Sequence, residues 1–317
     1  MIRIGFFGTP HLSARVLQDF LNHPEIEVIF VVTGEDKPIG RHQIITPNEV
    51  KTLAIQENIP VLQPACIREN TAFLEEITTY NVDYFVVVAY GKILPKELLE
   101  IPKKYPINIH GSILPKYRGA SPIQAALIEG ETETGVTIMV MGEKMDDGDI
   151  IDIQKISIDS VETTASLFEK FAKVSGNFAA ETLLKLDKEE LIPKVQDENQ
   201  VTYCKKITKE EGLLDFTKSA EELYHLYQGF TPWPGVYTTF KGKKLIIEKC
   251  SYNEITTEEG THGKVVQTEN KTIGIICDKG ILTLSQVKLE GKKSQSIQEF
   301  LNGQRDFIGN ILPSFII

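Results

Sequence analysis

Residues 84–89 of the chain read Tyr-Phe-Val-Val-Val-Ala, a run without a charged side chain. In a strand that faces water on one side, apolar residues alternate with polar ones, whereas here they follow one another directly. An uninterrupted apolar run is typical of a strand buried on both faces, as in parallel sheets covered by helices. This stretch therefore predicts an α/β domain.

Similar runs lie on both sides of residues 84–89 in the sequence. We expect further strands at residues 2–7, 28–32, 107–110, 137–141 and 150–158. After the first strand, apolar residues recur at helical spacing, at Leu12, Val16, Leu17, Phe20 and Leu21. Another helix is expected over residues 163–185. Strands that alternate with helices predict a Rossmann-like, mostly parallel sheet with helices on both faces.

The pattern changes after Lys209. A helix is expected over residues 219–228, and a turn rich in Gly and Pro follows it. Short alternating runs come next, at residues 235–240, 245–252, 263–268, 272–277 and 281–289. Such runs, with a last short helix at residues 297–301, are typical of a small β-barrel of the oligonucleotide-binding type. We therefore expect an α/β domain at residues 1–189, a linker at 190–206 and the barrel at 207–317.

Length and composition fit a globular protein of two domains. The chain has 317 residues, of which 41% are hydrophobic and 25% charged. No apolar run approaches the roughly 20 residues that span a membrane, and Met1–Gly5 reads as a strand rather than a secretion signal. We expect a cytoplasmic protein with no membrane segment. The four cysteines form no CxxC or Cys/His ligand pair, so we expect free thiols and no metal.

The net charge of -10 is distributed unevenly along the chain. Residues 1–200 carry 19 Lys and Arg against 30 Asp and Glu, whereas residues 201–317 carry 15 against 14. A solvated acidic surface on residues 1–200 explains the asymmetry as well as a polyanion-binding C-terminal region does. The charges permit a nucleic acid partner for the C-terminal region without demonstrating one.

The most informative stretch is residues 108–119, Asn-Ile-His-Gly-Ser-Ile-Leu-Pro-Lys-Tyr-Arg-Gly. Side chains two apart in a strand share a face, so Asn108 and His110 are expected to project together. Gly111 permits a sharp turn where the strand ends, and open α/β sheets hold their ligands at this end of the strands. An amide beside an imidazole suits acyl transfer, because both can bind the oxyanion that develops at the attacked carbonyl.

A carboxylate is available further along, in the tight turn Asp-Asp-Gly-Asp at residues 146–149. Placed close to His110, Asp146 would orient the ring and favour its protonated form. By pattern alone, however, Asn-x-His on a strand is more often structural than catalytic, and Asp-Asp-Gly-Asp also fits a solvated turn or a weak cation site. Both interpretations stay open at this point.

The longer run of residues 108–124 resembles the signature of enzymes that use 10-formyltetrahydrofolate. Further motifs fit the same family: Gly5–Pro10, Val87–Pro95, Thr134–Met139 and Asp146-x-Gly148-Asp149. The chain thus resembles the 10-formyltetrahydrofolate-dependent formyltransferases. This resemblance implies that Asn108, His110 and Asp146 are the catalytic residues, and that 10-formyltetrahydrofolate donates the formyl group without a metal.

The same resemblance implies two groups of residues that contact the folate. One group would lie against the folate: Ser112, Ile113, Leu114 and Pro115. The other would supply backbone contacts to the pterin ring: Tyr90, Gly91, Lys92, Ile93 and Leu94.

The C-terminal region resembles family members that act on methionyl-tRNA, through motifs within residues 203–216, 232–239 and 290–303. In those members the barrel contacts tRNA, so the resemblance implies formylation of the amino group of initiator methionyl-tRNA by a monomeric enzyme. Candidate tRNA contacts are Arg41, Lys205, Lys206, Lys209, Lys243 and Lys244. The basic residues that usually follow the arginine are replaced here by His42 and Gln43, which predicts weaker RNA binding through this loop.

Other interpretations stay open at the level of sequence. A sugar-nucleotide formyltransferase, or the hydrolase domain of a formyltetrahydrofolate dehydrogenase, would share the trio. A nicotinamide dehydrogenase is suggested by Gly5-Phe6-Phe7-Gly8, although the third glycine of the dinucleotide fingerprint is missing. An RNA-binding scaffold without activity is the remaining alternative.

Overall fold

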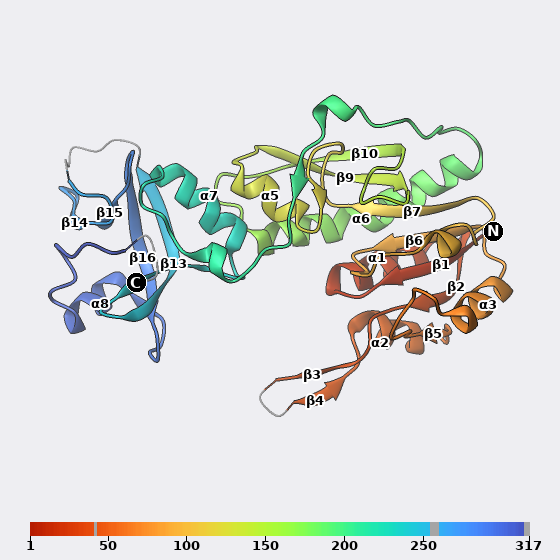
Figure 1. Cartoon of the computed structure of the whole chain (residues 1–317), viewed down its shortest axis with the longest axis horizontal. Helices are drawn as coiled ribbons and strands as arrows, with labels where there is room; N and C mark the ends of the chain where they lie inside the picture. Colours follow the sequence, from red (N-terminus) through yellow and green to blue (C-terminus); the bar gives the residue numbers. More distant parts are fainter. Residues whose placement is uncertain (41–42, 254–259, 314–317) are drawn as a thin grey trace. The chain divides into compact units, whose positions relative to one another are not determined.

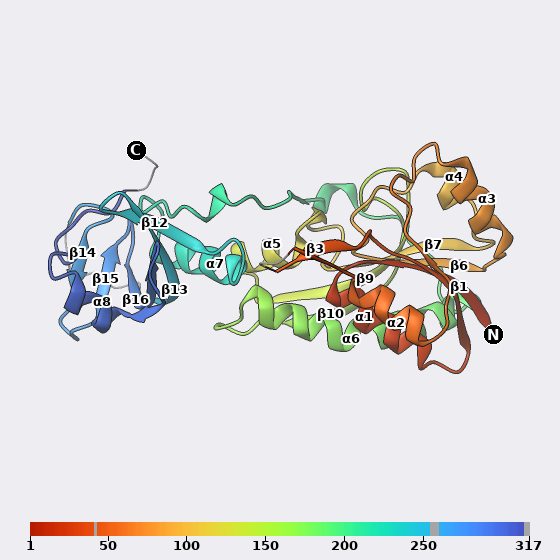
Figure 2. The ribbon, with the colours of Figure 1, turned by 90° about the horizontal axis from the view of Figure 1, so that it is seen from below.

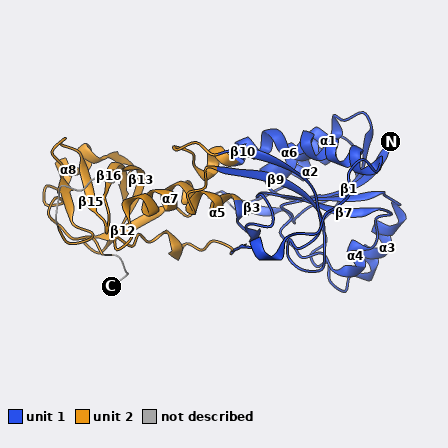
Figure 3. Cartoon of the chain, turned by 90° about the horizontal axis from the view of Figure 1, so that it is seen from above, with its two compact units in different colours: residues 1–122, 133–157, 168–204 blue, residues 123–132, 158–167, 205–317 orange. Residues whose placement is uncertain are grey.

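A computed structural model describes residues 1–40, 43–253 and 260–313 of the chain. The chain forms two compact units (Figure 3). The first unit comprises residues 1–122, 133–157 and 168–204, and the second comprises residues 123–132, 158–167 and 205–317. These boundaries differ from the domain, linker and barrel expected from the sequence. Two segments of the expected α/β domain group with the second unit, and most of the expected linker groups with the first.

The first unit is built on a seven-stranded sheet in the order β10-β9-β7-β6-β1-β2-β5. Its strands are β1 (Ile2–Gly8), β2 (Ile26–Val32), β5 (Val61–Leu62), β6 (Tyr84–Val88), β7 (Tyr105–His110), β9 (Glu133–Val140) and β10 (Ile150–Ser157). The five strands from β5 to β7 are parallel, which confirms the expected mostly parallel sheet. β9 is antiparallel to both β7 and β10. The turn between β9 and β10 is too short for a parallel crossover, which needs about a dozen residues.

Helices cover both faces of this sheet, as expected (Figures 2 and 3). One face carries α1 (His11–Leu21), α2 (Glu49–Gln56) and most of α6 (Thr164–Asp187), and the other carries α3 (Thr71–Thr79) and α4 (Lys96–Leu99). The predicted face of α1 is buried, since Val16, Leu17 and Phe20 are fully inaccessible. The sequence pattern predicts no helix at α2, α3 or α4. These helices are short, and Asn48 and Asn70 cap two of them.

The run that predicts the fold lies in the middle of the sheet. All five residues of β6 are buried, and β6 pairs with β1 on one side and with β7 on the other. The ring of Phe85 packs 4.9 Å from that of Phe7 and 6.0 Å from that of Phe30, measured between centroids. The aromatic residues of three neighbouring strands therefore form part of one core.

Short elements complete the first unit. A hairpin of β3 (Lys37–Ile39) and β4 (Ile44–Thr46) extends from the sheet where the sequence suggests a plain loop (Figure 1). β8 (Arg118–Gly119) pairs in parallel with β11 (Tyr203–Cys204), which is followed along the chain by the second unit. A 3-10 helix, η1 (Glu198–Gln200), precedes β11.

The second unit contains an antiparallel sheet in the order β12-β13-β16-β15-β14, with β17 paired to β16. Its strands are β12 (Val236–Phe240), β13 (Lys243–Asn253), β14 (Val265–Gln267), β15 (Ile273–Ile276), β16 (Ile281–Leu289) and β17 (Gln295–Ser296). All five predicted strands are present, although β12 and β14 do not pair within the described residues. Residues 309–313 bond to the β14 side through Val265 and to β12 through Thr238. The sheet is thus a half-barrel rather than a closed barrel.

Helices complete the second unit: α5 (Pro122–Ile128), η2 (Glu210–Gly212), α7 (Ala220–Phe230) and α8 (Ile297–Gly303). Both α7 and α8 begin with a capping box, at Ser219 and Ser296. The start of α6 joins this unit because the Thr164 hydroxyl donates to the Gly229 carbonyl at 2.6 Å. No helix among the described residues is long and apolar enough to cross a membrane.

Candidate active site

The C-terminal ends of β6 and β7 hold the predicted site. These strands pair in parallel, with Val87 opposite Asn108, so the loops that follow them begin at the same edge of the sheet. Asn108 and His110 lie two residues apart on β7 and share a face, as expected. His110 is 5% exposed and Asn108 is half-buried.

Asp146 joins these two residues from the turn between β9 and β10. Its Oδ2 lies 3.6 Å from Nδ1 of His110, and its Oδ1 lies 3.5 Å from the amide nitrogen of Asn108. The Gly119 N–H donates to Asp146 Oδ2 at 2.8 Å. The backbone of Asp146 is left-handed, with φ of 54°, a conformation that an L-residue adopts only when its surroundings hold it. The structure thus brings together the three residues that the sequence placed at the chemistry.

Two opposing effects act on the pKa of His110. Burial lowers the pKa of His110, and the Asp146 carboxylate and the Tyr117 carbonyl oppose this shift. The His110 Nε2 lies 3.1 Å from the Tyr117 carbonyl oxygen, so this nitrogen carries a proton and donates it. The carboxylate thus acts in the expected direction, while desolvation of the ring, which the sequence does not reveal, disfavours the charged form. The Nδ1 atom lies on the Asp146 side.

Residues 112–115 are fixed by a neighbour that the sequence pattern does not assign. The Thr137 hydroxyl on β9 donates to the Ser112 carbonyl at 2.6 Å and accepts the Leu114 N–H at 3.2 Å. Ser112 and Leu114 are buried, and the Leu114–Pro115 peptide bond is cis. The segment therefore has a defined path beside the trio. Thr137 lies within one of the family-like motifs, which is the signal that could have indicated it.

Residues 90–94 follow β6 at the same edge. The ring of Tyr90 packs edge-on against Phe7 at 5.8 Å, and burial raises the pKa of its hydroxyl to about 12. Lys92 ties the loop down by donating to the carbonyls of Pro64 and Ala65 at 2.7 and 2.9 Å. Gly91 is exposed with φ of 81°, which suits glycine. Tyr90, Lys92 and Leu94 thus anchor the loop at the edge that carries the trio, whereas the Ile93 side chain is exposed.

Known proteins match the chain over nearly its whole length. Residues 2–183 match the formyl transferase family, and residues 206–305 match the formyl transferase C-terminal domain family. A methionyl-tRNA formyltransferase of Caldicellulosiruptor saccharolyticus is 38% identical over 310 residues, which cover 98% of this chain and 99% of the relative. The chain belongs to the methionyl-tRNA formyltransferase family. A second member, from Lachnospira eligens, is 41% identical over 96% of this chain and 97% of its own.

More distant formyltransferases share the fold of this family member. WlaRD, a sugar 3N-formyl transferase, superposes with a TM-score of 0.66 at 21% identity, covering 92% of this chain and 99% of its own. An N-formyltransferase of Helicobacter canadensis superposes with a TM-score of 0.67 at 19% identity, covering 91% of this chain and all of its own. At this identity the likeness concerns the fold alone. The fold therefore does not separate acceptor classes, whereas the full-length relatives do.

The candidate tRNA contacts of this formyltransferase lie mainly in the second unit. Arg41 falls outside the described residues. The remaining candidates are Lys205, Lys206, Lys209 and Lys243, which are exposed, and Lys244, which is half-buried. The Lys244 ammonium lies 3.5 Å from the centroid of the Tyr237 ring.

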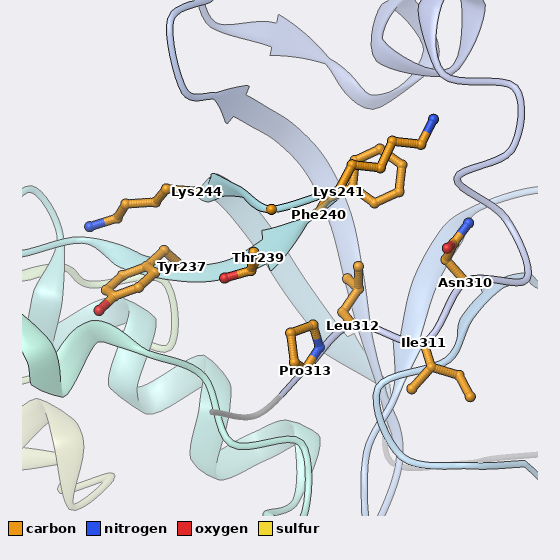
Figure 4. A pocket seen from close by; sticks show the side chains of 10 residues that line it. Tyr237, Thr239, Phe240, Lys241, Lys244, Asn310, Ile311, Leu312 and Pro313 are labelled. Carbon is orange, nitrogen blue, oxygen red and sulfur yellow. The ribbon is translucent and has the colours of Figure 1, made fainter. Parts of the chain in front are cut away.

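A groove of about 470 Å³ lies beside Lys244 in the second unit (Figure 4). It is lined by β12, the β12–β13 turn and residues 310–313. Lys241, at its rim, is paired with Asp306 at 2.7 Å. This groove holds none of the predicted catalytic residues, which all belong to the first unit. The trio itself is formed by the end of β7 and the β9–β10 turn.

Two further residues of the site are not assigned by the sequence. Arg118 and Gln196 are both buried, at 2% and 4% exposure, and they contact each other close to Asp146. Arg118 stands within the informative stretch but outside the predicted catalytic set. Gln196 falls in the expected linker, where its charged neighbours give no sign of burial.

Proposed function

We propose that the chain transfers the formyl group of 10-formyltetrahydrofolate to the amino group of initiator methionyl-tRNA, giving N-formylmethionyl-tRNA for translation initiation. The observation that carries this proposal is the convergence of Asn108, His110 and Asp146 at the sheet edge. The acceptor is supported by relatives of the same length that bear this activity in their name. We further propose a monomeric enzyme that works in the cytoplasm, where initiator tRNA is used.

In the proposed reaction, the neutral amine attacks the formyl carbon and a new C–N bond forms. The carbonyl oxygen gains negative charge, and the side-chain amide N–H of Asn108 donates a hydrogen bond to it. The attacking amine becomes positively charged and loses a proton, which the neutral ring of His110 takes up, because the developing anion raises the proton affinity of the ring. Asp146, 3.6 Å from the ring, stabilises the resulting imidazolium.

The intermediate then collapses by breaking the bond between the formyl carbon and N10 of the folate. The proton lost by the attacking amine passes through His110, with Asp146 and water, to the leaving nitrogen. Residues 112–115 and 90–94 are proposed to hold the folate on either side of the reacting carbon. These steps require hydrogen bonds and charge only, so we propose no metal in this reaction.

The direct test is incubation with 10-formyltetrahydrofolate and methionyl-tRNA, followed by detection of N-formylmethionine after deacylation. An amino-sugar nucleotide is the parallel acceptor. We expect formylated methionine and unmodified sugar nucleotide, and the reverse result would assign the chain to the other acceptor class. Replacing Asn108 or His110 with alanine should lower turnover by about 10²–10³-fold while folate binding persists. Near-normal turnover in both variants would remove these residues from the mechanism.

A further inference from the structure

The Gln196 side chain uses its whole hydrogen-bonding capacity inside the protein. Its Nε2 donates to the Asp146 carbonyl at 2.8 Å and to the Gly148 carbonyl at 2.7 Å. Its Oε1 accepts from Nε and from one Nη of Arg118 at 3.0 and 2.9 Å. One amide therefore connects the turn that carries Asp146 to the guanidinium of Arg118.

Arg118 is itself held by its neighbours. Its guanidinium pairs with Glu198 at 2.8 Å, and its backbone N–H donates to the Thr202 carbonyl at 2.9 Å. Tyr117 and Ala120, on either side, donate their N–H groups to the Thr202 hydroxyl and the Cys204 carbonyl. Residues 196–204 thus fix residues 117–120 through both side chain and backbone.

Two backbone groups of residues 117–120 that are held in this way contact the trio directly. The Tyr117 carbonyl accepts from His110 Nε2, and the Gly119 N–H donates to Asp146 Oδ2. Gln196 meanwhile binds the carbonyl of Asp146 itself, whose φ of 54° requires support from its surroundings. Residues 196–204 therefore fix the groups that contact both His110 and Asp146.

From this geometry we infer that Gln196 is a positioning residue for Asp146, and that it acts together with Arg118 to set the carboxylate against His110. The catalytic consequence of this inference rests on the proposed function, whereas the positioning of Asp146 does not depend on it. The hydrogen bonds of Gln196 go to Arg118 and to the backbone of the Asp146 turn. Its effect on the reaction is exerted through the place and orientation of Asp146.

A purely structural role for Gln196 predicts a different response to substitution. Gln196→Glu keeps the size of the side chain and strengthens the contact with Arg118 by adding a charge. The same change replaces the two N–H donors with an oxygen that faces the carbonyls of Asp146 and Gly148. If only the anchoring of residues 196–204 mattered, glutamate would serve as well as glutamine. If the turn must be held, glutamate fails.

The test compares Gln196→Glu and Gln196→Ala with a control in the same segment, Gln200→Ala. Gln200 is exposed and donates to Asp197 at 2.8 Å, so its loss leaves the trio's supports in place. We expect kcat for formylation to fall about 10- to 100-fold in both Gln196 variants and to stay within about twofold in the control, since a displacement of about 1 Å at a reacting group can cost about 100-fold.

A second measurement separates this inference from the proposed function. The pKa of His110, followed by nuclear magnetic resonance in the full chain, should fall further in Gln196→Ala, because the nearby Asp146 charge opposes the effect of burial. Gln196→Glu adds a carboxylate of its own near the ring and is therefore compared by kcat alone. We expect the Tyr117 carbonyl to keep its place in Gln196→Ala, because the Tyr117 and Arg118 N–H groups are bonded to Thr202. A chain inactive on methionyl-tRNA but showing this shift overturns the function and keeps the positioning role. An unchanged His110 pKa in Gln196→Ala, together with wild-type kcat in Gln196→Glu, overturns the inference even if the variants unfold at a lower temperature.

Discussion

Replacing Asp146 with asparagine removes one charge and preserves the shape of the site. The new side-chain oxygen can still accept the Gly119 N–H that Asp146 Oδ2 accepts at 2.8 Å, so the turn retains this support. What is lost is the negative charge 3.6 Å from Nδ1 of His110, together with the weak contact of Asp146 Oδ1 with the Asn108 amide at 3.5 Å. We therefore expect Asp146→Asn to affect chemistry far more than folding.

The size of the effect follows from this distance and from burial. The side chains of His110 and Asp146 are 5% and 14% exposed, so water screens the pair only partly. Two unit charges about 4 Å apart interact by about 4 kcal/mol at an effective dielectric constant of about 20. Removing the carboxylate also removes its own desolvation cost, which offsets some of the loss. We expect a net loss of about 2–3 kcal/mol in the transition state, or roughly 30- to 150-fold in rate.

The assay is single-turnover formylation of methionyl-tRNA with saturating 10-formyltetrahydrofolate, quenched and analysed for N-formylmethionine. Single turnover isolates the chemical step from product release. Asp152→Asn on β10 is the matched control, because its carboxylate accepts the neighbouring Ile153 N–H and lies outside the trio. Thermal unfolding of both variants shows whether the fold is preserved.

A rate within about threefold of wild type in a folded Asp146→Asn chain would refute this reasoning, since about 2 kcal/mol corresponds to about 30-fold. An equal loss in the Asp152→Asn control would also refute it, because the effect would then not come from the trio. The variant carries a second signature. Without the Asp146 charge the pKa of His110 should fall further than burial already lowers it.

Three other measurements test contacts in the same structure. Gly119→Ala should destabilise the first unit by about 1–3 kcal/mol in denaturant unfolding, because φ is 133° there and the added carbon would collide with the Cys204 carbonyl; unchanged stability would contradict the close approach of the two strands. Lys205→Gln with Lys206→Gln should make log(kcat/KM) for methionyl-tRNA fall less steeply with log salt concentration, since each lost phosphate contact reduces the slope by about 0.7–0.9, and an unchanged slope would exclude both residues from the RNA surface. Burial lowers the pKa of His110 from 6.5, so as pH falls the unfolded chain takes up a proton at this ring before the folded chain does. The free energy of unfolding should therefore decrease below about pH 6.5 in the wild type. In His110→Gln this contribution to the decrease should be absent.

The pattern of apolar residues determined much of the first unit. A strand such as residues 84–88 must be covered on both faces wherever it occurs, because none of its side chains can face water at low cost. In the second unit, alternation of apolar and polar residues predicted all five strands, because alternation marks a strand with one buried face. The sequence pattern predicted no helix at α2 or α3, because each is short and buries only two residues. The antiparallel β9 and β10 follow from connection length rather than from side chains.

Part of the site could be predicted from the sequence. Asn108 and His110 share a strand, so a spacing of two placed them together without further information. Their partner Asp146 lies 36 residues beyond His110 and is brought in by the β9–β10 turn. Its place in the trio came from family resemblance rather than from spacing.

Burial and long-range contacts were decided by the tertiary structure alone. The sequence could place a carboxylate near His110, but only packing shows that desolvation of the ring opposes the effect of that charge. Gln196 reads as belonging to a polar linker, yet the folded chain buries it against Arg118 and the Asp146 turn. Periodicity reports which face of an element is apolar, whereas the pairing of buried polar groups depends on segments that are far apart in the chain. The chemistry of this protein depends on such pairings, and these exist only once the chain has folded.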